Sequence, residues 1–133
     1  MYRMYNPNSG EHFYTGSASE RDSLKRSGWN YEGVGFRAFV KSNTPMYRLY
    51  NPNAGDHHYT SSTQERDHLL RIGWKDEGIG WYAGDTHGLE MARLYNPNAL
   101  GAGAHHYTSD WKERNYLIKS GWKYEGLGFY AAN

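Results

Sequence analysis

The chain repeats one pattern three times, and this repetition constrains its fold more than any other feature. The repeats begin at Met1, Met46 and Met91, so their starts are 45 residues apart. A unit of this length cannot bury a core by itself, and neighbouring units of a repeat protein share one. We therefore expect a single domain over residues 1–133, built from repeats 1–45, 46–90 and 91–133.

The composition is polar but rich in aromatic residues. Aromatic side chains make up 17% of the 133 residues, with 13 Tyr and 5 Trp, and the mean hydropathy is −0.96. The core must therefore rest on large aromatics with Leu, Ile and Met. Tyr and Trp combine an apolar face with a polar group, which suits sugar or peptide binding. The alternative is that most of these rings only fill the core.

Charge and hydropathy exclude several classes of function. The net charge is +1 without a block of Lys or Arg, which argues against nucleic-acid binding. No apolar run approaches the ~18 residues of a membrane span, and we recognise no signal peptide. Cysteine is absent, so there are no disulfides, but this does not fix the compartment. The ends coincide with repeat boundaries, as expected of a module excised from a larger protein; a free-standing small protein is the alternative.

Each repeat is predicted to contain strand, strand, helix, strand, strand. In repeat 2 a turn at residues 51–55 joins strands 47–51 and 57–60. The helix begins at a capping box and ends at a glycine in the left-handed conformation. Strands 74–78 and 80–83 follow. The capping boxes are Ser17 with Glu20, Ser62 with Glu65, and Asp110 with Glu113, and the terminating glycines are Gly28, Gly73 and Gly121.

Four strands in each of three units predict a mainly β protein with one short helix per repeat. Our first choice is a pseudo-threefold, β-trefoil-like body, and the alternative is a three-bladed, propeller-like arrangement. The tryptophan that follows each terminating glycine is predicted to be a largely buried core anchor. These residues are Trp29, Trp74 and Trp122.

The candidate ligand-binding residues of each repeat are the turn asparagine, the histidine that recurs in register, and the tyrosine two positions later. Strand alternation places this His and Tyr on one face, with the Asn at its edge. The nine candidates are Asn8, His12, Tyr14, Asn53, His57, Tyr59, Asn98, His105 and Tyr107. The alternative is a buried His–Tyr hydrogen-bond network. In that case the exposed candidates become Tyr31, Tyr82, Tyr124 and Tyr130.

No pattern predicts catalysis, a metal site or a cofactor. The chain lacks the GxSxG, P-loop, HExxH and GxGxxG motifs. Arg–Glu pairs, such as Arg48 with Glu77, are interpreted as architectural. The acidic residue Asp56 corresponds to Glu11 in repeat 1, but repeat 3 has Ala104 at this position. A symmetric hydrolase with a carboxylate pair in every repeat is therefore disfavoured. Three in-register histidines could converge on the axis as a metal site, but hydrogen bonding within each repeat or to a ligand is the favoured interpretation.

The cluster YRLYNPN…HHYT…ER…L…GW…EGIGWYA resembles a tandem-repeat family of unknown function. Such repeats are seen in secreted surface proteins and in cell-wall hydrolases and endolysins of Gram-positive bacteria and their phages. The resemblance covers essentially the whole chain. It implies an extracellular or cell-surface module that is not itself catalytic and holds an enzyme on the cell wall or another glycan.

The three repeats differ at a few positions of this pattern. Arg37 stands where the others have Tyr82 and Tyr130, and Ala92 stands where the others have Tyr2 and Tyr47. Repeat 3 also has a lengthened turn at residues 100–104. We therefore expect repeat 2 to hold the most complete site.

The favoured function is a carbohydrate-binding, cell-wall-targeting module that is multivalent through its three repeats. Linked weak sites gain avidity for a repetitive ligand. The partner would be cell-wall glycan or another surface carbohydrate, and the module is predicted to be monomeric and not to insert into membranes. The alternative is a protein-interaction or adhesion module of a secreted surface protein. The sequence does not name the sugar or the parent protein.

Overall fold

The computed structural model describes residues 1–99 and 104–133; residues 100–103, in the lengthened turn of repeat 3, lie outside the described ranges. Each repeat contains two strands, a helix and a third strand. Repeat 1 contains β1 (Tyr2–Tyr5), β2 (His12–Thr15), α1 (Ala18–Arg26) and β3 (Asn30–Val34). Repeat 2 contains β4 (Thr44–Asn51), β5 (Asp56–Thr60), α2 (Thr63–Arg71) and β6 (Lys75–Ala83). Repeat 3 contains β7 (Leu89–Tyr95), β8 (His105–Thr108), α3 (Trp111–Lys119) and β9 (Lys123–Ala131).

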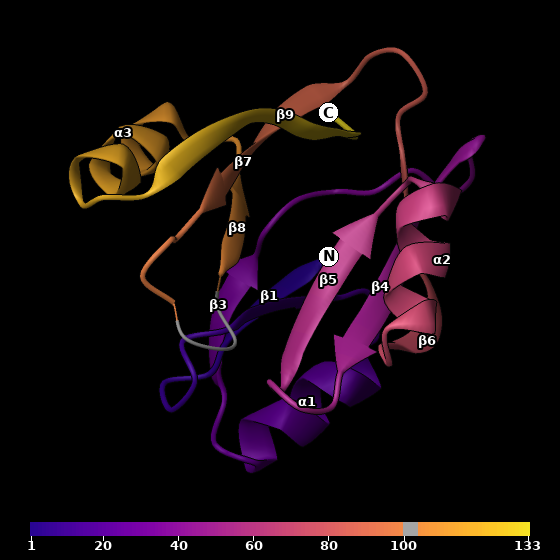
Figure 1. Ribbon diagram of the computed structural model, residues 1–133. Helices are drawn as coiled ribbons and strands as arrows, with labels where there is room; N and C mark the ends of the chain where they lie inside the picture. Colours follow the sequence, from indigo (N-terminus) through magenta and orange to yellow (C-terminus); the bar gives the residue numbers. More distant parts are fainter. Residues whose placement is uncertain (100–103) are drawn as a thin grey trace.

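The protein is mainly β and has three small antiparallel sheets, one in each repeat. Their strand orders are β2-β1-β3, β5-β4-β6 and β8-β7-β9. The first strand of each repeat is therefore central, and the same topology three times indicates threefold pseudosymmetry. Figure 1 shows the three helices spread around the outside of the molecule. These strands pair only within their own repeat, and no closed barrel is formed by the described residues.

The prediction of four strands per repeat is wrong. The two final strands expected in repeat 2 are one strand, β6, and β9 is its equivalent in repeat 3. The register against β4 shifts twice, because Leu49 pairs with Asp76, Tyr47 with Ile79, and Met46 with Trp81. Gly78, with φ of 85°, lies in the first of these bulges. A bulge bends a strand without ending it, and the sequence pattern does not distinguish a bulge from a turn.

The helix boundaries follow the predicted signals. The Glu20 and Glu65 backbone N–H groups donate to Ser17 and Ser62 Oγ, each at 3.1 Å, and Asp110 Oδ1 accepts from Lys112 N–H at 2.9 Å. The terminating glycines have φ of 101–107°, as a left-handed position after the helix requires. No helix contributes a fully buried residue, so the helices cover the outside of the sheets.

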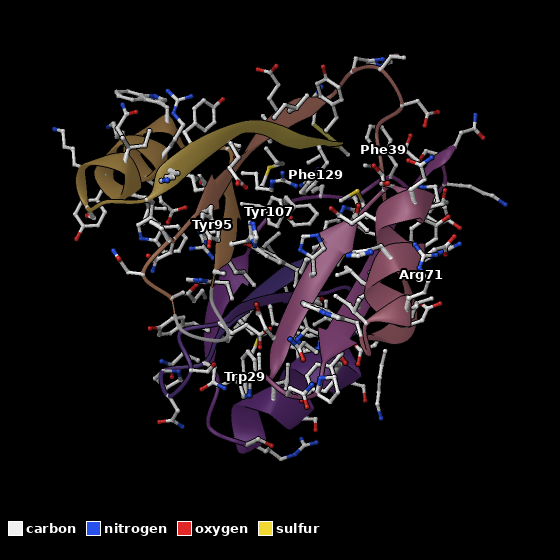
Figure 2. The ribbon with its side chains drawn as sticks, in the orientation of Figure 1. Trp29, Phe39, Arg71, Tyr95, Tyr107 and Phe129 are labelled. Atoms are coloured by element: carbon white, nitrogen blue, oxygen red, sulfur yellow. The ribbon has the colours of Figure 1, made fainter. Side chains whose placement is uncertain are left out.

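The shared core is aromatic and lies where the three repeats meet. Tyr107 and Phe129 point into the middle of the molecule in Figure 2. Side chains of all three repeats form this core: Tyr14, Phe36, Met46, Tyr59, Trp81, Ala83, Met91, Tyr107, Phe129 and Ala131. A single core built by all three repeats explains why one unit of this polar sequence does not suffice.

Backbone hydrogen bonds join the repeats in a ring. The Phe39 N–H donates to Tyr82 O at 3.1 Å, which joins the end of repeat 1 to repeat 2. Gly84 N–H donates to Tyr130 O at 2.9 Å, which joins repeat 2 to repeat 3. Ala132 N–H donates to Arg37 O at 2.8 Å and closes the ring between repeats 3 and 1.

Candidate functional site

The tyrosines of the predicted triads lie in the core. Tyr14, Tyr59 and Tyr107 are only 2–4% exposed, and their ring centroids are mutually 5.9–6.4 Å apart. Tyr59 Oη accepts the Tyr14 backbone N–H at 3.2 Å, and the Tyr14 hydroxyl donates to Tyr107 O at 3.3 Å. Burial raises the pKa of Tyr14, and it raises the pKa of Tyr107 to about 12. A ligand cannot stack on these rings in this structure, so their expected role as a surface platform is corrected to a structural one.

The turn asparagines lie away from these rings. Asn8, Asn53 and Asn98 are exposed, and their backbone N–H groups donate to Oδ1 of the asparagine two residues earlier, at 2.9–3.0 Å. They stabilise the turns that join the first two strands. The asparagines are exposed and the tyrosines are buried, so the members of each predicted Asn–His–Tyr set do not share one open surface.

The in-register histidines lie at the contacts between repeats. His12 packs on His106 at 4.4 Å between ring centroids, His57 on Phe13 at 4.6 Å, and His105 on His58 at 5.5 Å. In each pair the second ring belongs to the preceding repeat of the cycle. A cavity of about 10 Å³ lies between the histidines and the core tyrosines, which is room for one water at most. Among the described residues no group of three or more potential metal ligands is placed to hold an ion.

A geometry of charged groups that recurs in the three repeats surrounds each in-register histidine. His57 Nε2 lies 3.2 Å from Glu77 Oε1, and Arg48 Nε lies 2.9 Å from the same oxygen. Arg48 Nη1 also reaches Glu20 of repeat 1 at 3.3 Å. In repeat 1, Arg3 pairs in the same way with Glu32 at 3.0 Å and with Glu113 of repeat 3 at 3.5 Å. These arginines therefore connect two repeats, which confirms that Arg–Glu pairs occur and adds an interface role.

The capping-box glutamates have a role that their motif does not predict. The backbone N–H of each N-cap residue is already bonded to a threonine two residues earlier: Thr15, Thr60 or Thr108, at 3.0–3.1 Å. The glutamate side chain is therefore free for other partners, and Glu20 and Glu113 reach Arg48 and Arg3 of the next repeat in the ring. Glu65 accepts from His58 at 2.9 Å and Glu113 from His106 at 3.0 Å. The expectation that capping alone explains these glutamates is thus incomplete.

A groove opens where repeat 1 meets repeat 2. Its volume is about 280 Å³, and its lining combines aromatic rings with charged groups: Phe13, Glu20, Leu24, Trp29, Arg48, Tyr50, His57 and Glu77. Trp29 is half-buried beside α1 (Figure 2) and contacts Phe13 edge-on at 6.0 Å. A concave apolar lining with a few convergent polar groups is typical of a ligand site.

The tryptophans differ from the prediction that they are core anchors. Trp29, Trp74 and Trp122 occupy matching positions but are half-buried and lie outside the central aromatic core. Trp74 and Trp122 contact His58 and His106, each at 6.3 Å. These ring contacts lie within single repeats, and Trp29 also lines a groove with Arg48 and His57 of repeat 2.

The corresponding surfaces at the other two interfaces are more polar. Histidines 58 and 106 replace Phe13 and bond their glutamates. The hydrogen bond from His106 lowers the pKa of Glu113 to about 2. Desolvation, then the neighbouring His106 and Arg3, lowers the pKa of His12 to about 3. His12 is therefore neutral at pH 7 and is available to accept or donate one hydrogen bond.

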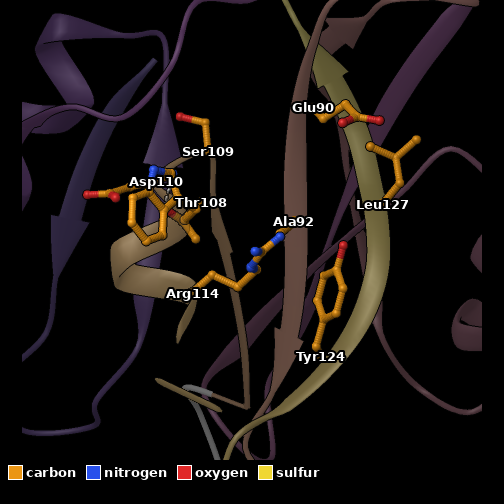
Figure 3. A pocket seen from close by; sticks show the side chains of 9 residues that line it. Glu90, Ala92, Thr108, Ser109, Asp110, Arg114, Tyr124 and Leu127 are labelled. Carbon is orange, nitrogen blue, oxygen red and sulfur yellow. Dashed lines mark hydrogen bonds between the residues drawn. The ribbon is translucent and has the colours of Figure 1, made fainter. Parts of the chain in front are cut away.

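A second pocket lies on the outside of repeat 3, between its sheet and α3 (Figure 3). Its volume is about 150 Å³, and its lining residues are Glu90, Ala92, Thr108, Ser109, Asp110, Trp111, Arg114, Tyr124 and Leu127. Of these, the sequence indicated Tyr124 as an alternative candidate, Asp110 as a helix cap and Ala92 as a departure from the repeat pattern. The missed signal is Trp111, an exposed aromatic residue in the first turn of α3.

No helix of the described residues is both long enough and apolar enough to span a membrane. Comparison with known proteins identifies the family of the chain and no characterised relative. No characterised protein and no solved structure matches the chain. Residues 1–132 match the family described as Domain of unknown function (DUF5648). Because this match spans all three repeats, the chain belongs to the DUF5648 family.

Proposed function

We propose that the protein is a non-catalytic carbohydrate-binding module whose sites are the grooves between repeats. The observation that carries this proposal is the lining of the groove between repeats 1 and 2. There the Trp29 and Tyr50 rings lie with Arg48, His57 and Glu77 around about 280 Å³. Sugar rings present apolar faces that pack on aromatic side chains and hydroxyls that need paired donors and acceptors.

The ring of repeats supports multivalent binding. Trp74 and Trp122 are half-buried at positions equivalent to Trp29, and the Arg–Glu pair that lines the groove recurs in the other two repeats. Three weak sites on one rigid body would raise apparent affinity for a polymeric glycan by about 10²–10⁴ without new contacts. The sheets that present these grooves are, in this proposal, the blades of a three-bladed, propeller-like body.

A cell-wall polysaccharide is the proposed partner, and the extracellular surface is the proposed location. Both rest on the resemblance of the repeat to modules of secreted proteins. The groove's acidic groups argue against a second, hydrolytic role, because Glu20 and Glu77 are each paired with Arg48. A purified domain should therefore leave cell-wall glycan intact, and turnover that is lost in Glu77→Gln would contradict the non-catalytic proposal.

The test compares a groove variant with a matched aromatic variant elsewhere. Trp29→Leu removes the groove ring but keeps an apolar side chain against Phe13. Tyr116→Ala removes a ring that is 68% exposed on α3 and lines neither pocket. Binding is measured by calorimetry with N-acetylglucosamine, its tetramer and Gram-positive cell walls.

We expect the tetramer and cell walls to bind much more tightly than the monosaccharide. Trp29→Leu should remove one of the monosaccharide sites and reduce cell-wall affinity at least tenfold, while Tyr116→Ala should change neither. His57→Ala is unsuitable, because it would leave the buried Glu11 carboxylate without the ring that lies 2.8 Å from it. Equal loss in both variants, or no glycan binding by the wild type, would refute the groove proposal.

The alternative function, protein interaction or adhesion, is favoured by one observation. Repeat 3 exposes large apolar side chains on and beside its helix, namely Trp111, Tyr116, Tyr124 and Leu127. Exposed aromatic clusters commonly mark interaction sites. Binding to a surface protein that persists in excess monosaccharide would favour this function over glycan recognition.

A further inference from the structure

One position on the central strand distinguishes repeat 3 from the other two. Tyr2, Tyr47 and Ala92 occupy equivalent places, because each pairs with the last threonine of the second strand. In repeats 1 and 2 an arginine of the helix lies over the tyrosine ring. Arg21 Cζ is 4.5 Å from the Tyr2 ring centroid, and Arg66 Cζ is 4.5 Å from the Tyr47 centroid.

Repeat 3 keeps the arginine but lacks this ring. Arg114 is the equivalent of Arg21 and Arg66, and it lines the pocket of Figure 3 together with Ala92 and Tyr124. The pocket is therefore the space that the repeat's own tyrosine fills elsewhere. Arg114 instead lies over the Tyr124 ring, with 5.3 Å between its Cζ atom and the ring centroid.

The walls of the pocket keep the contacts that an aromatic ring uses. In repeat 1 the Tyr2 ring meets the Tyr31 ring edge-on, with centroids 6.0 Å apart and planes at 70°. Tyr124 of repeat 3 occupies the position of Tyr31, since Tyr31 pairs with Met4 and Tyr124 pairs with Leu94, the equivalent residue of the central strand. A ring in the pocket would thus have a cation above its face and an aromatic neighbour at its edge.

Two aromatic side chains of the pocket are open to solvent. Trp111 is 61% exposed and Tyr124 is 50% exposed. Trp111 replaces Ala18 and Thr63 of the other repeats. Repeat 3 thus lacks an aromatic residue inside the pocket and has gained one at its entrance.

We infer that this pocket binds an aromatic ring, a phenyl or phenol group supplied by a ligand, in the place that Tyr2 and Tyr47 occupy in their own repeats. A cavity of about 150 Å³ is large enough for a benzene-sized ring. The guanidinium of Arg114 selects for a π face, which a saturated sugar ring lacks. The inference uses a different surface from the grooves and does not depend on glycan binding.

The probe for this site is p-cresol, the side chain of tyrosine as a free molecule. Titration of the whole chain is followed by the NMR signals of the Trp111 indole N–H and the Arg114 Nε–H. We expect one site with a dissociation constant of about 1 mM, in keeping with so few non-hydrogen atoms. N-acetyl-tyrosine amide, titrated in parallel, distinguishes a polypeptide source from a free phenol, because only a polypeptide source predicts tighter binding of the amide.

Three variants test the assignment. Ala92→Tyr restores the residue of repeats 1 and 2 and should weaken p-cresol binding at least tenfold without lowering the melting temperature. Arg114→Gln should weaken it about three- to tenfold through loss of the cation–π contact, whereas its matched control, Arg66→Gln in repeat 2, should leave it unchanged. Tyr2→Ala should open an equivalent pocket in repeat 1 and raise the stoichiometry from one to two.

Several results would overturn the inference. These are unchanged p-cresol affinity in both Ala92→Tyr and Arg114→Gln, equal effects of the Arg114 and Arg66 variants, or the same chemical shifts produced by N-acetylglucosamine but not by p-cresol. Failure of the glycan tests at the grooves would leave the p-cresol result unaffected, so the two proposals fail separately.

Discussion

Tyr59→Phe should destabilise the protein more than Tyr14→Phe, although both remove one buried hydroxyl. Tyr59 Oη accepts the backbone N–H of Tyr14 at 3.2 Å. Tyr14 lies on β2, an edge strand of its sheet, and is 2% exposed. Without the Tyr59 hydroxyl this N–H is left buried and unpaired, which costs about 1–3 kcal/mol.

The hydroxyl of Tyr14 has the opposite role, since it donates to Tyr107 O at 3.3 Å. Removing a donor from a carbonyl leaves an under-satisfied acceptor, which proteins tolerate more often than an orphaned N–H. We expect Tyr14→Phe to cost about 0.5–1.5 kcal/mol. At this chain length, Tyr59→Phe should lower the melting temperature by roughly 3–10 °C.

Urea unfolding followed by tryptophan fluorescence measures both free energies of unfolding. The comparison is valid where the two variants share the wild-type dependence on urea. The reasoning is refuted if Tyr59→Phe is as stable as wild type or more stable than Tyr14→Phe. That result would mean that water or a backbone shift satisfies the Tyr14 N–H when the hydroxyl is gone.

Three further predictions concern the core, the ring closure and acid stability. Trp81→Phe should change the free energy of unfolding by less than about 1 kcal/mol, because lost packing is offset by removal of a buried indole N–H that has no partner; a loss of several kcal/mol in urea unfolding would contradict this. Gly84→Ala should destabilise by about 1–3 kcal/mol or more, since its Cβ would clash with the His87 carbonyl oxygen, and calorimetry should show a lower melting temperature. Folding lowers the pKa of His12 from 6.5 to about 3, so between these pH values the unfolded chain binds a proton that the folded chain does not. The stability that depends on neutral His12 is therefore full above pH 6.5 and is lost as the pH falls toward 3. In thermal unfolding, a His12→Gln variant should lose less stability than wild type between pH 7 and pH 4.

Local signals in the sequence were sufficient for the helices but not for the strands. A cap such as Ser62 and a stop such as Gly73 act within a few residues, so the sequence pattern contains their whole cause. The bulge at Gly78 depends on pairing with β4, about 30 residues earlier in the chain. The same glycine is compatible with a turn until that pairing is known, and this is why one strand was predicted as two.

The surroundings of the candidate site residues could not be predicted for a different reason. Strand alternation correctly places His57 and Tyr59 on one face, but it does not say whether that face meets solvent or another repeat. The shared core decides this, because three polar units can bury enough apolar area only by directing their Tyr14-type rings toward one another. The contact of His57 with Phe13 joins two repeats, so no pattern within a single repeat could predict it.

The two proposed kinds of site use different features of the repeats: the grooves use what the repeats share, and the pocket uses a position at which repeat 3 differs. In the sequence, Ala92 is a departure from a repeated tyrosine, and repeat 2 is therefore predicted to be the most complete unit. In the structure, the tyrosines of repeats 1 and 2 lie under their own arginines, and the same arginine in repeat 3 lines an open pocket. A residue that completes a repeat as a structural unit also fills the space that a ligand would need. Recognition in a symmetric repeat protein can therefore arise where the symmetry is broken, and the p-cresol titration asks whether it does so here.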